Sequence, residues 1–217
     1  MDISEIIMKI TELTGVIVCA ISGSMISIDR KLDAVGVVII GCVTAVGGGL
    51  IRDIIIGRTP PAVFSNEYIL ITAALTSLLT FIAVYFFHNI YNLFQKNTDE
   101  IINFLDAIGL AAFTIIGTEA AKNAGFYDNM LLAVTLGTIT GVGGGVLRDT
   151  LTNVMPYILR KHIYAVASVV GSILYYILDI SSVPRIFSVM LSISTVVTIR
   201  LLASKYRWNM PKINLDK

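Results

Sequence analysis

Charged residues are scarce in this chain. Asp, Glu, Lys and Arg make up 14% of the 217 residues, hydrophobic residues make up 55%, and the mean hydropathy is +0.81. Because a soluble domain carries about 25% charged residues, this composition argues against a soluble protein and is typical of a chain embedded in a membrane. The formal net charge of +1 gives no reason to expect a nucleic-acid partner.

Cysteines and recognisable catalytic patterns are also few. The two cysteines, Cys19 and Cys42, lie in apolar segments without metal-ligand spacing, so we interpret them as small buried hydrophobic residues. The glycine runs lack the Lys-Ser/Thr of a phosphate-binding loop, and no constellation for hydrolysis or metal catalysis is present. We therefore predict that the protein is not an enzyme and carries no metal or other cofactor.

Long hydrophobic runs, by contrast, fill the sequence. A helix needs roughly 20 mainly apolar residues to span a membrane. Seven segments suit this role, and their approximate bounds are Ile6–Ile28, Leu32–Ile56, Tyr68–Phe87, Phe104–Ala121, Met130–Leu151, Ile163–Leu178 and Ile186–Leu202. The first follows acidic rather than basic residues, so we expect a retained span and not a cleaved signal peptide. The sequence predicts one all-α integral membrane domain over residues 1–217.

The basic residues divide unevenly between the two sides of such a domain. One side would hold Arg30, Lys31, Lys96, Arg160, Lys161, Lys205, Arg207, Lys212 and Lys217. The other would hold Lys9, Arg58, Lys122 and Arg185. Because Lys and Arg favour cytoplasmic loops, we predict a multi-pass protein of the cell (inner) membrane, with its N-terminus outside and its C-terminus in the cytoplasm. The basic, aromatic tail after Leu202 would contact membrane lipid headgroups.

A glycine-rich motif with a charge pair occurs twice. The segment Gly47–Asp53 reads GGGLIRD, and Gly143–Asp149 reads GGGVLRD, 96 positions later. The same displacement matches Gly41 with Gly137, Thr44 with Thr140, Val46 with Val142, Pro60 with Pro156 and Tyr68 with Tyr164. With a small gap, Ala20–Gly23 also resembles Thr114–Gly117. The chain is therefore interpreted as an internal duplication.

The duplication predicts an inverted architecture. Repeat one would cover about residues 6–90 and repeat two about 103–180, with a seventh helix at about 186–202 outside the repeat. Because each repeat holds three spans, the second enters the membrane from the opposite side. A pseudo-two-fold axis in the membrane plane should then relate the two copies.

The glycine triplets predict a kink or an unwound turn in the second and fifth spans. Three helical glycines cost roughly 1 kcal/mol each relative to alanine, and freed carbonyl groups suit a cation. The predicted ion pathway comprises Gly47, Gly48, Gly49, Gly143, Gly144, Gly145, Thr44, Thr140, Ser22 and Thr118. Alternatively, the glycines only allow close helix crossing. Two copies at equivalent places favour the pathway, although both roles are compatible.

The charge pairs Arg52-Asp53 and Arg148-Asp149 would open the second half of each broken helix. Because neighbouring residues on a helix do not face each other, we expect Arg52 to pair with Asp149 and Arg148 with Asp53, across the repeat axis. These pairs would either hold the kinks together or gate the pathway. Glu119 and Lys122 are spaced to pair with each other at the end of the fourth span.

These features resemble the prokaryotic members of the trimeric intracellular cation (TRIC) channel family, whose sequences are also grouped as UPF0126 membrane proteins or under a glycine transporter label. The doubled motif, Ile21–Gly23, Leu105–Leu110 and the seven spans carry the resemblance, from about Ile10 to Leu202. It implies a homotrimer with one pore per protomer, permeable to potassium and other monovalent cations, and lined by the glycines of the second and fifth spans.

We therefore predict a passive, potassium-permeable channel that uses K⁺ or Na⁺ only as permeant ions. The alternative is a secondary transporter of a small zwitterion such as glycine, since inverted repeats with broken helices also occur in transporters. A transporter would show saturable flux and no unitary currents. A structural scaffold is the weakest reading, because it leaves the doubled motif without a purpose.

Overall fold

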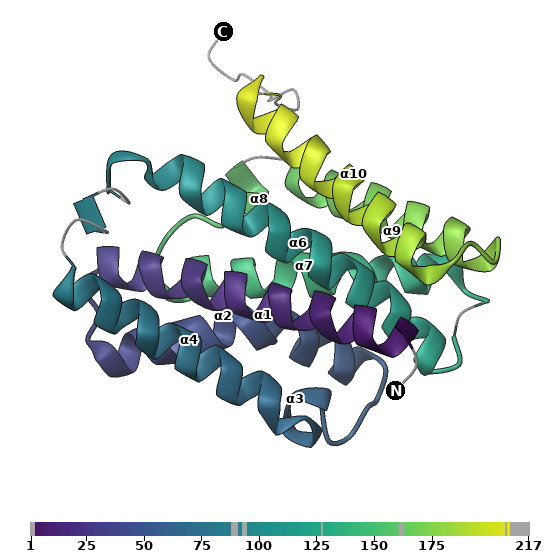
Figure 1. The fold of residues 1–217 in the computed structure, drawn as a ribbon, viewed down its shortest axis with the longest axis horizontal. Helices are drawn as coiled ribbons and strands as arrows, with labels where there is room; N and C mark the ends of the chain where they lie inside the picture. The colour runs from purple at the N-terminus through teal and green to yellow at the C-terminus, as the bar shows by residue number, and fades with distance from the viewer. Residues whose placement is uncertain are drawn as a thin grey trace, which may run out of the picture.

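The computed structural model describes residues 3–87, 91–92, 95–126, 128–160, 163–206 and 208, and its regular elements are helices (Figure 1). Seven of them are long and apolar enough to cross a membrane. They are α1 (Ile3–Asp29), α2 (Ala34–Ile55), α4 (Glu67–Phe86), α6 (Thr98–Asn123), α7 (Met130–Leu151), α9 (Ile163–Ile180) and α10 (Arg185–Lys205). The short helices α3 (Ala62–Ser65) and α8 (Tyr157–Arg160) follow α2 and α7. The seven predicted spans are thereby confirmed.

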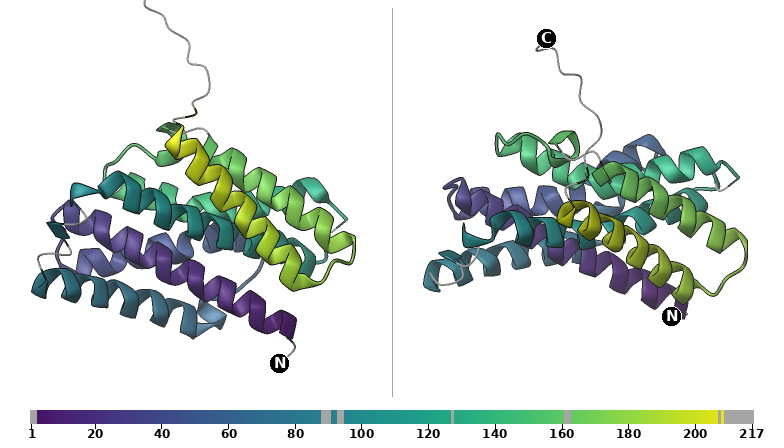
Figure 2. Two further views of the ribbon diagram at one scale, coloured as in Figure 1. Left: turned by 45° about the horizontal axis from the view of Figure 1, so that its top comes forward. Right: turned by 90° about the horizontal axis from the view of Figure 1, so that it is seen from above.

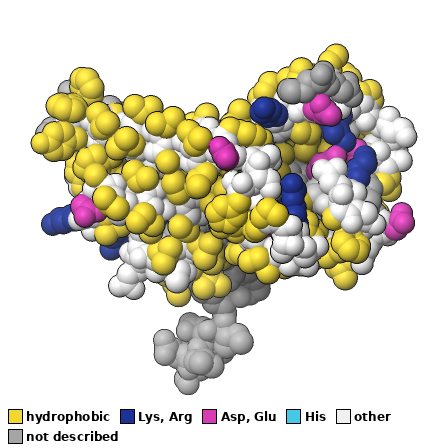
Figure 3. Space-filling model, turned by 90° about the horizontal axis from the view of Figure 1, so that it is seen from below, with side chains coloured by type: hydrophobic (Ala, Val, Ile, Leu, Met, Phe, Trp, Pro, Cys, Tyr) yellow, Lys and Arg dark blue, Asp and Glu magenta, His cyan; other side chains and the backbone are white. Residues whose placement is uncertain are grey.

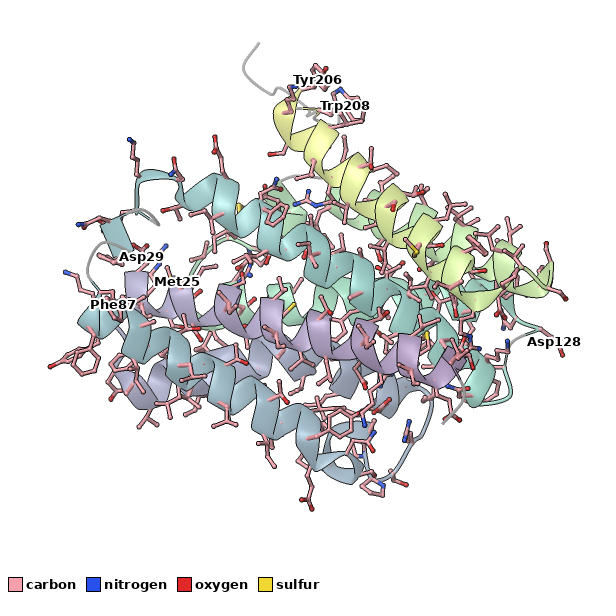
Figure 4. The ribbon with its side chains drawn as sticks, in the orientation of Figure 1. Met25, Asp29, Phe87, Asp128, Tyr206 and Trp208 are labelled. Carbon is pink, nitrogen blue, oxygen red and sulfur yellow. The ribbon has the colours of Figure 1, made fainter. Side chains whose placement is uncertain are left out.

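The long helices alternate in direction, which sorts the connections between two ends of the bundle. Asp29 and Phe87 lie at one end and Asp128 lies at the other (Figure 4). Among the described residues, this alternation places four basic residues at the same end of the bundle, as predicted. They are Arg30 and Lys31 after α1, Lys96 before α6, and Lys205 at the end of α10. Lys161, Arg207, Lys212 and Lys217 lie outside the described residues. Which end faces the cytoplasm stays a prediction.

The two glycine-containing helices begin in the same way. The Asp33 side chain accepts a hydrogen bond from the Gly36 backbone N–H at 2.8 Å, and the Asn129 side chain accepts one from the Leu132 N–H at 3.0 Å. Each cap satisfies an amide that has no partner within the helix. Turn chemistry at the membrane surface therefore sets where both α2 and α7 start.

Helix α6 is the centre of the bundle. Of its most apolar 18-residue window, 72% is buried, against 17% for α4. It begins at Thr98 and ends at Asn123, and so runs further than the predicted Phe104–Ala121. Its polar residues Asn103, Asp106 and Glu119 are buried against neighbouring helices. Helix α10 lies beside α9, on the far side of the bundle from α4 (Figure 2).

Helices α1 and α6 pack against each other reciprocally. A Cβ added to Gly15 would lie 3.1 Å from the Phe113 ring, while one added to Gly109 would overlap the Cys19 sulfur. Gly109 and Phe113 each lie 94 positions after their counterparts Gly15 and Cys19. The first helices of the two copies therefore correspond at a displacement of 94, and the later helices at 96.

Helices α2 and α7 cross at backbone contact through their glycines. A Cβ on Gly48 would overlap the carbonyl oxygen of Thr140, and one on Gly144 would overlap that of Thr44. A Cβ on Gly143 would lie 2.9 Å from the Gly48 Cα. The close-crossing role of the glycines, considered above as the alternative, is therefore present in the structure. Small residues commonly serve this purpose between membrane helices.

The predicted unwound turn is wrong. Both helices continue without interruption through the triplets and end at Ile55 and Leu151. The two Arg-Asp pairs therefore lie near the end of one continuous helix and do not open a second half-helix. Backbone contact between α2 and α7 accounts for the glycines without any break in hydrogen bonding. Kinking of these helices stays a prediction.

Substituting single glycines of the first triplet tests this packing. We expect Gly48→Ala to destabilise the protein by about 1–3 kcal/mol, because its Cβ meets backbone that has no rotamer to change. Gly49→Ala is the matched control, since its Cβ would have nothing closer than the Arg52 Nη2 atom at 3.7 Å. Thermal unfolding in detergent measures both. Equal melting temperatures for the two variants would contradict the crossing.

Candidate functional site: a charged cavity and two Arg-Asp clusters

A large cavity opens at the end of the bundle where α1 begins and α2 and α6 end. Its volume is about 1180 Å³. The charged side chains that line it are Glu5, Lys9, Glu12, Arg52, Arg58, Glu119, Lys122 and Arg185. In Figure 3, hydrophobic side chains cover most of the visible face, and charges of both signs gather towards one end of it. We call this cavity the vestibule.

A smaller cavity adjoins the base of the vestibule. It has a volume of about 30 Å³ and shares Glu12 and Arg52 with the vestibule. Gly49 and Thr140 also line it, so it reaches the crossing of α2 and α7. Since a water needs roughly 10–15 Å³ of such space, this cavity has room for about two waters. The vestibule and the smaller cavity together form a recess that enters the bundle from one side. Charged side chains line its mouth, whereas apolar side chains such as Val16 and Phe113 make up most of the inner wall.

The first Arg-Asp pair forms within its own copy of the repeat. The Nε and Nη2 atoms of Arg52 both lie 2.8 Å from the Asp53 Oδ1 atom. The Asp53 Oδ2 atom accepts a hydrogen bond at 2.7 Å from the backbone N–H of Ala62, which begins α3. Asp53 therefore ties the end of α2 to the short helix that follows it.

The second pair repeats this arrangement and adds further partners. The Arg148 Nε atom donates to Asp149 Oδ1 at 2.8 Å, and Asp149 Oδ2 accepts from the Tyr157 backbone N–H at 2.8 Å. The two terminal nitrogens of Arg148 also bind both oxygens of Asp106, at 2.7 and 2.9 Å. The Ser22 hydroxyl accepts from Arg148 at 2.6 Å and donates to Asp106 at 3.0 Å. Arg148 is only 1% exposed.

The predicted pairing across the repeat axis is wrong. Each arginine binds the aspartate that directly follows it, Arg52 with Asp53 and Arg148 with Asp149. The rule that adjacent helical residues do not face each other fails here because the arginine side chain is long enough to curl round to its neighbour. The actual cross-helix partner of Arg148 is Asp106 from α6, within the same copy.

The two copies differ in what their acidic residue on the first helix does. At the displacement of 94, Asp106 corresponds to Glu12. Asp106 binds Arg148 in the sealed cluster, whereas Glu12 accepts a hydrogen bond from the Tyr68 hydroxyl at 2.9 Å. Among the described residues, Glu12 has no ion-pair partner, and it borders both cavities together with Arg52. One copy is therefore closed by a bidentate ion pair, and the other is open to the vestibule.

The remaining predicted site residues lie along the helix crossings. The Thr44 and Thr140 hydroxyls each donate to a carbonyl of their own helix at 2.6 Å, and the Thr118 hydroxyl does so at 2.9 Å. Only Ser22 reaches a charged cluster. Gly49 and Gly145 lie one turn before the arginines of their own motifs, and leave room for the guanidinium groups.

Glu119 and Lys122 do not pair with each other as expected. Glu119 binds Arg185 at 2.7 Å and accepts from the Tyr175 hydroxyl at 2.9 Å. Lys122 binds Asp179 at 2.7 Å. Both ion pairs connect α6 to the last spans at the rim of the vestibule, so they stabilise its wall.

Sequence reasoning missed Glu12 and Asp106 as a corresponding pair. A signal for this was present, because the gap that aligns Ala20–Gly23 with Thr114–Gly117 also aligns Glu12 with Asp106.

For metals, the described part of the chain brings together no group of three His, Cys, Asp or Glu side chains that could hold an ion.

Comparison with known proteins places the chain among bacterial membrane proteins. The family model described as glycine transporter matches it twice, over residues 9–85 and 103–179. The UPF0126 inner membrane protein YadS of Escherichia coli K12 is 37% identical over 210 residues, covering 95% of this chain and 96% of that protein. The UPF0126 membrane protein YvgT of Bacillus subtilis is 31% identical, with 94% and 95% covered.

Solved structures show the same fold. A TRIC cation channel studied for the structural basis of its conductance has a TM-score of 0.81 and 34% identity, covering 96% of this chain and 98% of that one. The TRIC trimeric intracellular cation channel orthologue from Rhodobacter sphaeroides has a TM-score of 0.82 and 27% identity, with 93% and 99% covered. The resemblance inferred from the doubled motif is thereby confirmed. The protein belongs to the family of the TRIC channels and UPF0126 membrane proteins, whose family model is described as glycine transporter.

Proposed function

We propose that the protein is a cation channel, permeable to potassium and other monovalent cations, that works as a homotrimer with one pore in each protomer. The observation that carries the proposal is the similarity to a TRIC cation channel over 96% of the chain at a TM-score of 0.81. The orthologue from Rhodobacter sphaeroides is described as trimeric. Flow would be passive, down the electrochemical gradient.

This recess supplies the first half of the proposed path. A cation would enter the vestibule, meet the Glu12 carboxylate at its base, and pass into the small cavity beside Gly49 and Thr140. Glu12 can contact a passing cation directly, because it makes no ion pair with another described residue. Gly49 leaves space in the small cavity at the α2–α7 crossing, where the threonine and serine hydroxyls of the predicted pathway would replace part of the ion's hydration.

The second half of the path is closed by the Arg148 cluster. Neither the vestibule nor the small cavity is lined by Arg148 or Asp149. Since Arg148 is held by Asp106, Asp149 and Ser22, an ion can pass only when these contacts rearrange. We therefore assign the cluster a gating role, and we assign the open first-copy pair of Arg52 and Asp53 the role of holding α2 to α3.

The membrane placement completes the proposal. The basic residues at the ends of α1 and α10 favour a cytoplasmic C-terminus, so the vestibule would open to the outside. Tyr206 and Trp208, whose rings stack at 6.3 Å beyond α10, suit the lipid headgroup region. The inverted repeats at about 6–90 and 103–180 would each contribute one half of the pore.

A second candidate is a transporter of a small zwitterion, and the description of the matching family model as glycine transporter favours it. The vestibule offers both signs of charge, as a zwitterion requires. A transporter would accumulate or exchange glycine with saturable kinetics. A channel would pass cations whether or not glycine is present.

Recording from purified protein in a planar bilayer under a potassium chloride gradient tests the proposed function. We expect unitary currents that reverse near the potassium equilibrium potential, because the chain shares its fold with TRIC cation channels and Glu12 can contact a passing cation. Correctly folded, inserted protein that gives no unitary current but takes up glycine in liposomes would replace the channel with the transporter.

Isosteric variants of the two corresponding carboxylates, Asp106 and Glu12, test whether their roles differ. We expect Asp106→Asn to destabilise the protein by about 3–5 kcal/mol, because breaking a buried ion pair leaves Arg148 undercompensated. Glu12→Gln should leave the melting temperature nearly unchanged, since the amide oxygen still accepts from Tyr68, but lower the cation conductance about twofold at low salt. The assignment fails if Glu12→Gln is the less stable variant, or if it conducts like the wild type.

A further inference from the structure

A cation lies over the corresponding tyrosine in each copy of the repeat. The Lys9 Nζ atom is 4.7 Å from the centre of the Tyr68 ring, and the Arg200 guanidinium carbon is 4.5 Å from the centre of the Tyr164 ring. Tyr68 and Tyr164 are matched by the displacement of 96. Lys9 belongs to the first helix of its copy, whereas Arg200 comes from α10, which lies outside the repeat.

The position that corresponds to Lys9 in the second copy explains this difference. At the displacement of 94 that relates α1 to α6, the counterpart of Lys9 is Asn103, which carries no charge. The Arg200 Nη2 atom donates a hydrogen bond to the Asn103 side-chain oxygen at 2.7 Å. The arginine of the seventh helix therefore binds the residue that stands where the first copy has its lysine.

Arg200 is also connected to the second Arg-Asp cluster. Its guanidinium carbon lies 5.1 Å from the centre of the Tyr157 ring, and the Tyr157 hydroxyl donates to Asn103 at 3.2 Å. The Tyr157 backbone N–H is the group that binds Asp149. Arg200 is 1% exposed. A buried arginine is expensive unless charges or rings compensate it. Two aromatic faces and the Asn103 oxygen compensate Arg200 in part, while its Nε atom has no hydrogen-bond partner among the described residues.

The two clusters have the same balance of formal charge. The first copy has two cations, Arg52 and Lys9, and two carboxylates, those of Asp53 and Glu12. In the second, the cations Arg148 and Arg200 stand against the carboxylates of Asp149 and Asp106. Without Arg200, the second set would carry two carboxylates and one cation.

We propose that Arg200 prevents the second cluster from concentrating cations on the α8 side of the pore: it supplies to that cluster the cation that Lys9 supplies to the first, and so holds it at zero formal charge. The inference rests on the proposed channel function, and it gives the seventh helix a role in permeation. A neutral cluster neither concentrates cations nor repels them at that mouth.

Moving the charge between two positions tests the proposal. We expect Arg200→Met to leave the cluster with one excess negative charge, which raises potassium conductance about twofold at low salt and lowers the melting temperature. The double variant Asn103→Lys/Arg200→Met returns a cation to the position of Lys9, so both quantities should return towards the wild type. Arg200→Lys keeps the charge and should conduct like the wild type.

Salt dependence gives an independent readout of charge. At about 1 M salt the screening length falls to ~3 Å, so the conductance gain of Arg200→Met should vanish there if it is electrostatic. A gain that persists at high salt would overturn the proposal. So would an Arg200→Met variant that matches the wild type, or a double variant that behaves like Arg200→Met in both conductance and melting temperature.

Failure of the channel function would look different. If the wild type gives no unitary current, the melting temperatures alone decide the charge assignment. Recovery of stability on adding Asn103→Lys to Arg200→Met would then support Arg200 as the supplied cation, and no recovery would overturn it.

Discussion

The backbone contact between α2 and α7 is the constraint on which the rest of the structure depends. Gly48 faces the Thr140 carbonyl, and Gly144 faces the Thr44 carbonyl. The contact is therefore reciprocal, because equivalent residues of the two copies make it. Because the helices run in opposite directions, their charge pairs lie on opposite sides of the crossing. A single close contact thus separates two chemically similar clusters across the thickness of the bundle.

Similar motifs on the two sides have different surroundings. In the second copy, two carboxylates and a hydroxyl enclose Arg148 in a medium of low dielectric constant, where a lost partner is not replaced by water. In the first copy, Arg52 borders a cavity and Glu12 binds a tyrosine hydroxyl. The duplication therefore supplies two copies of one Arg-Asp cluster. The helices packed around each cluster determine whether it borders a cavity.

The sequence predicted the spans and the repeat well because both depend on patterns that persist over many residues. Seven apolar runs and a motif at a constant displacement are hard to misread. Pairing of single side chains was predicted badly, since it depends on tertiary contacts. The Arg148–Asp106 bond joins residues 42 positions apart, and Arg200 meets Asn103 across 97. The glycines were predicted partly correctly: their importance was clear, but uninterrupted helices show that close approach does not require unwinding.

The position of Arg200 near the end of the last helix has a consequence for how the protein is made. The ribosome releases α10 after every other span, so the bundle is first assembled around Asp106, Asp149 and Arg148 with Arg200 still absent. During that interval the second cluster holds an unbalanced carboxylate within the membrane. Insertion of the seventh helix ends this imbalance, so the order of synthesis makes α10 the closing step of assembly. A ribosome that stalls before residue 200 would leave six spans in the membrane around a charge that they cannot neutralise.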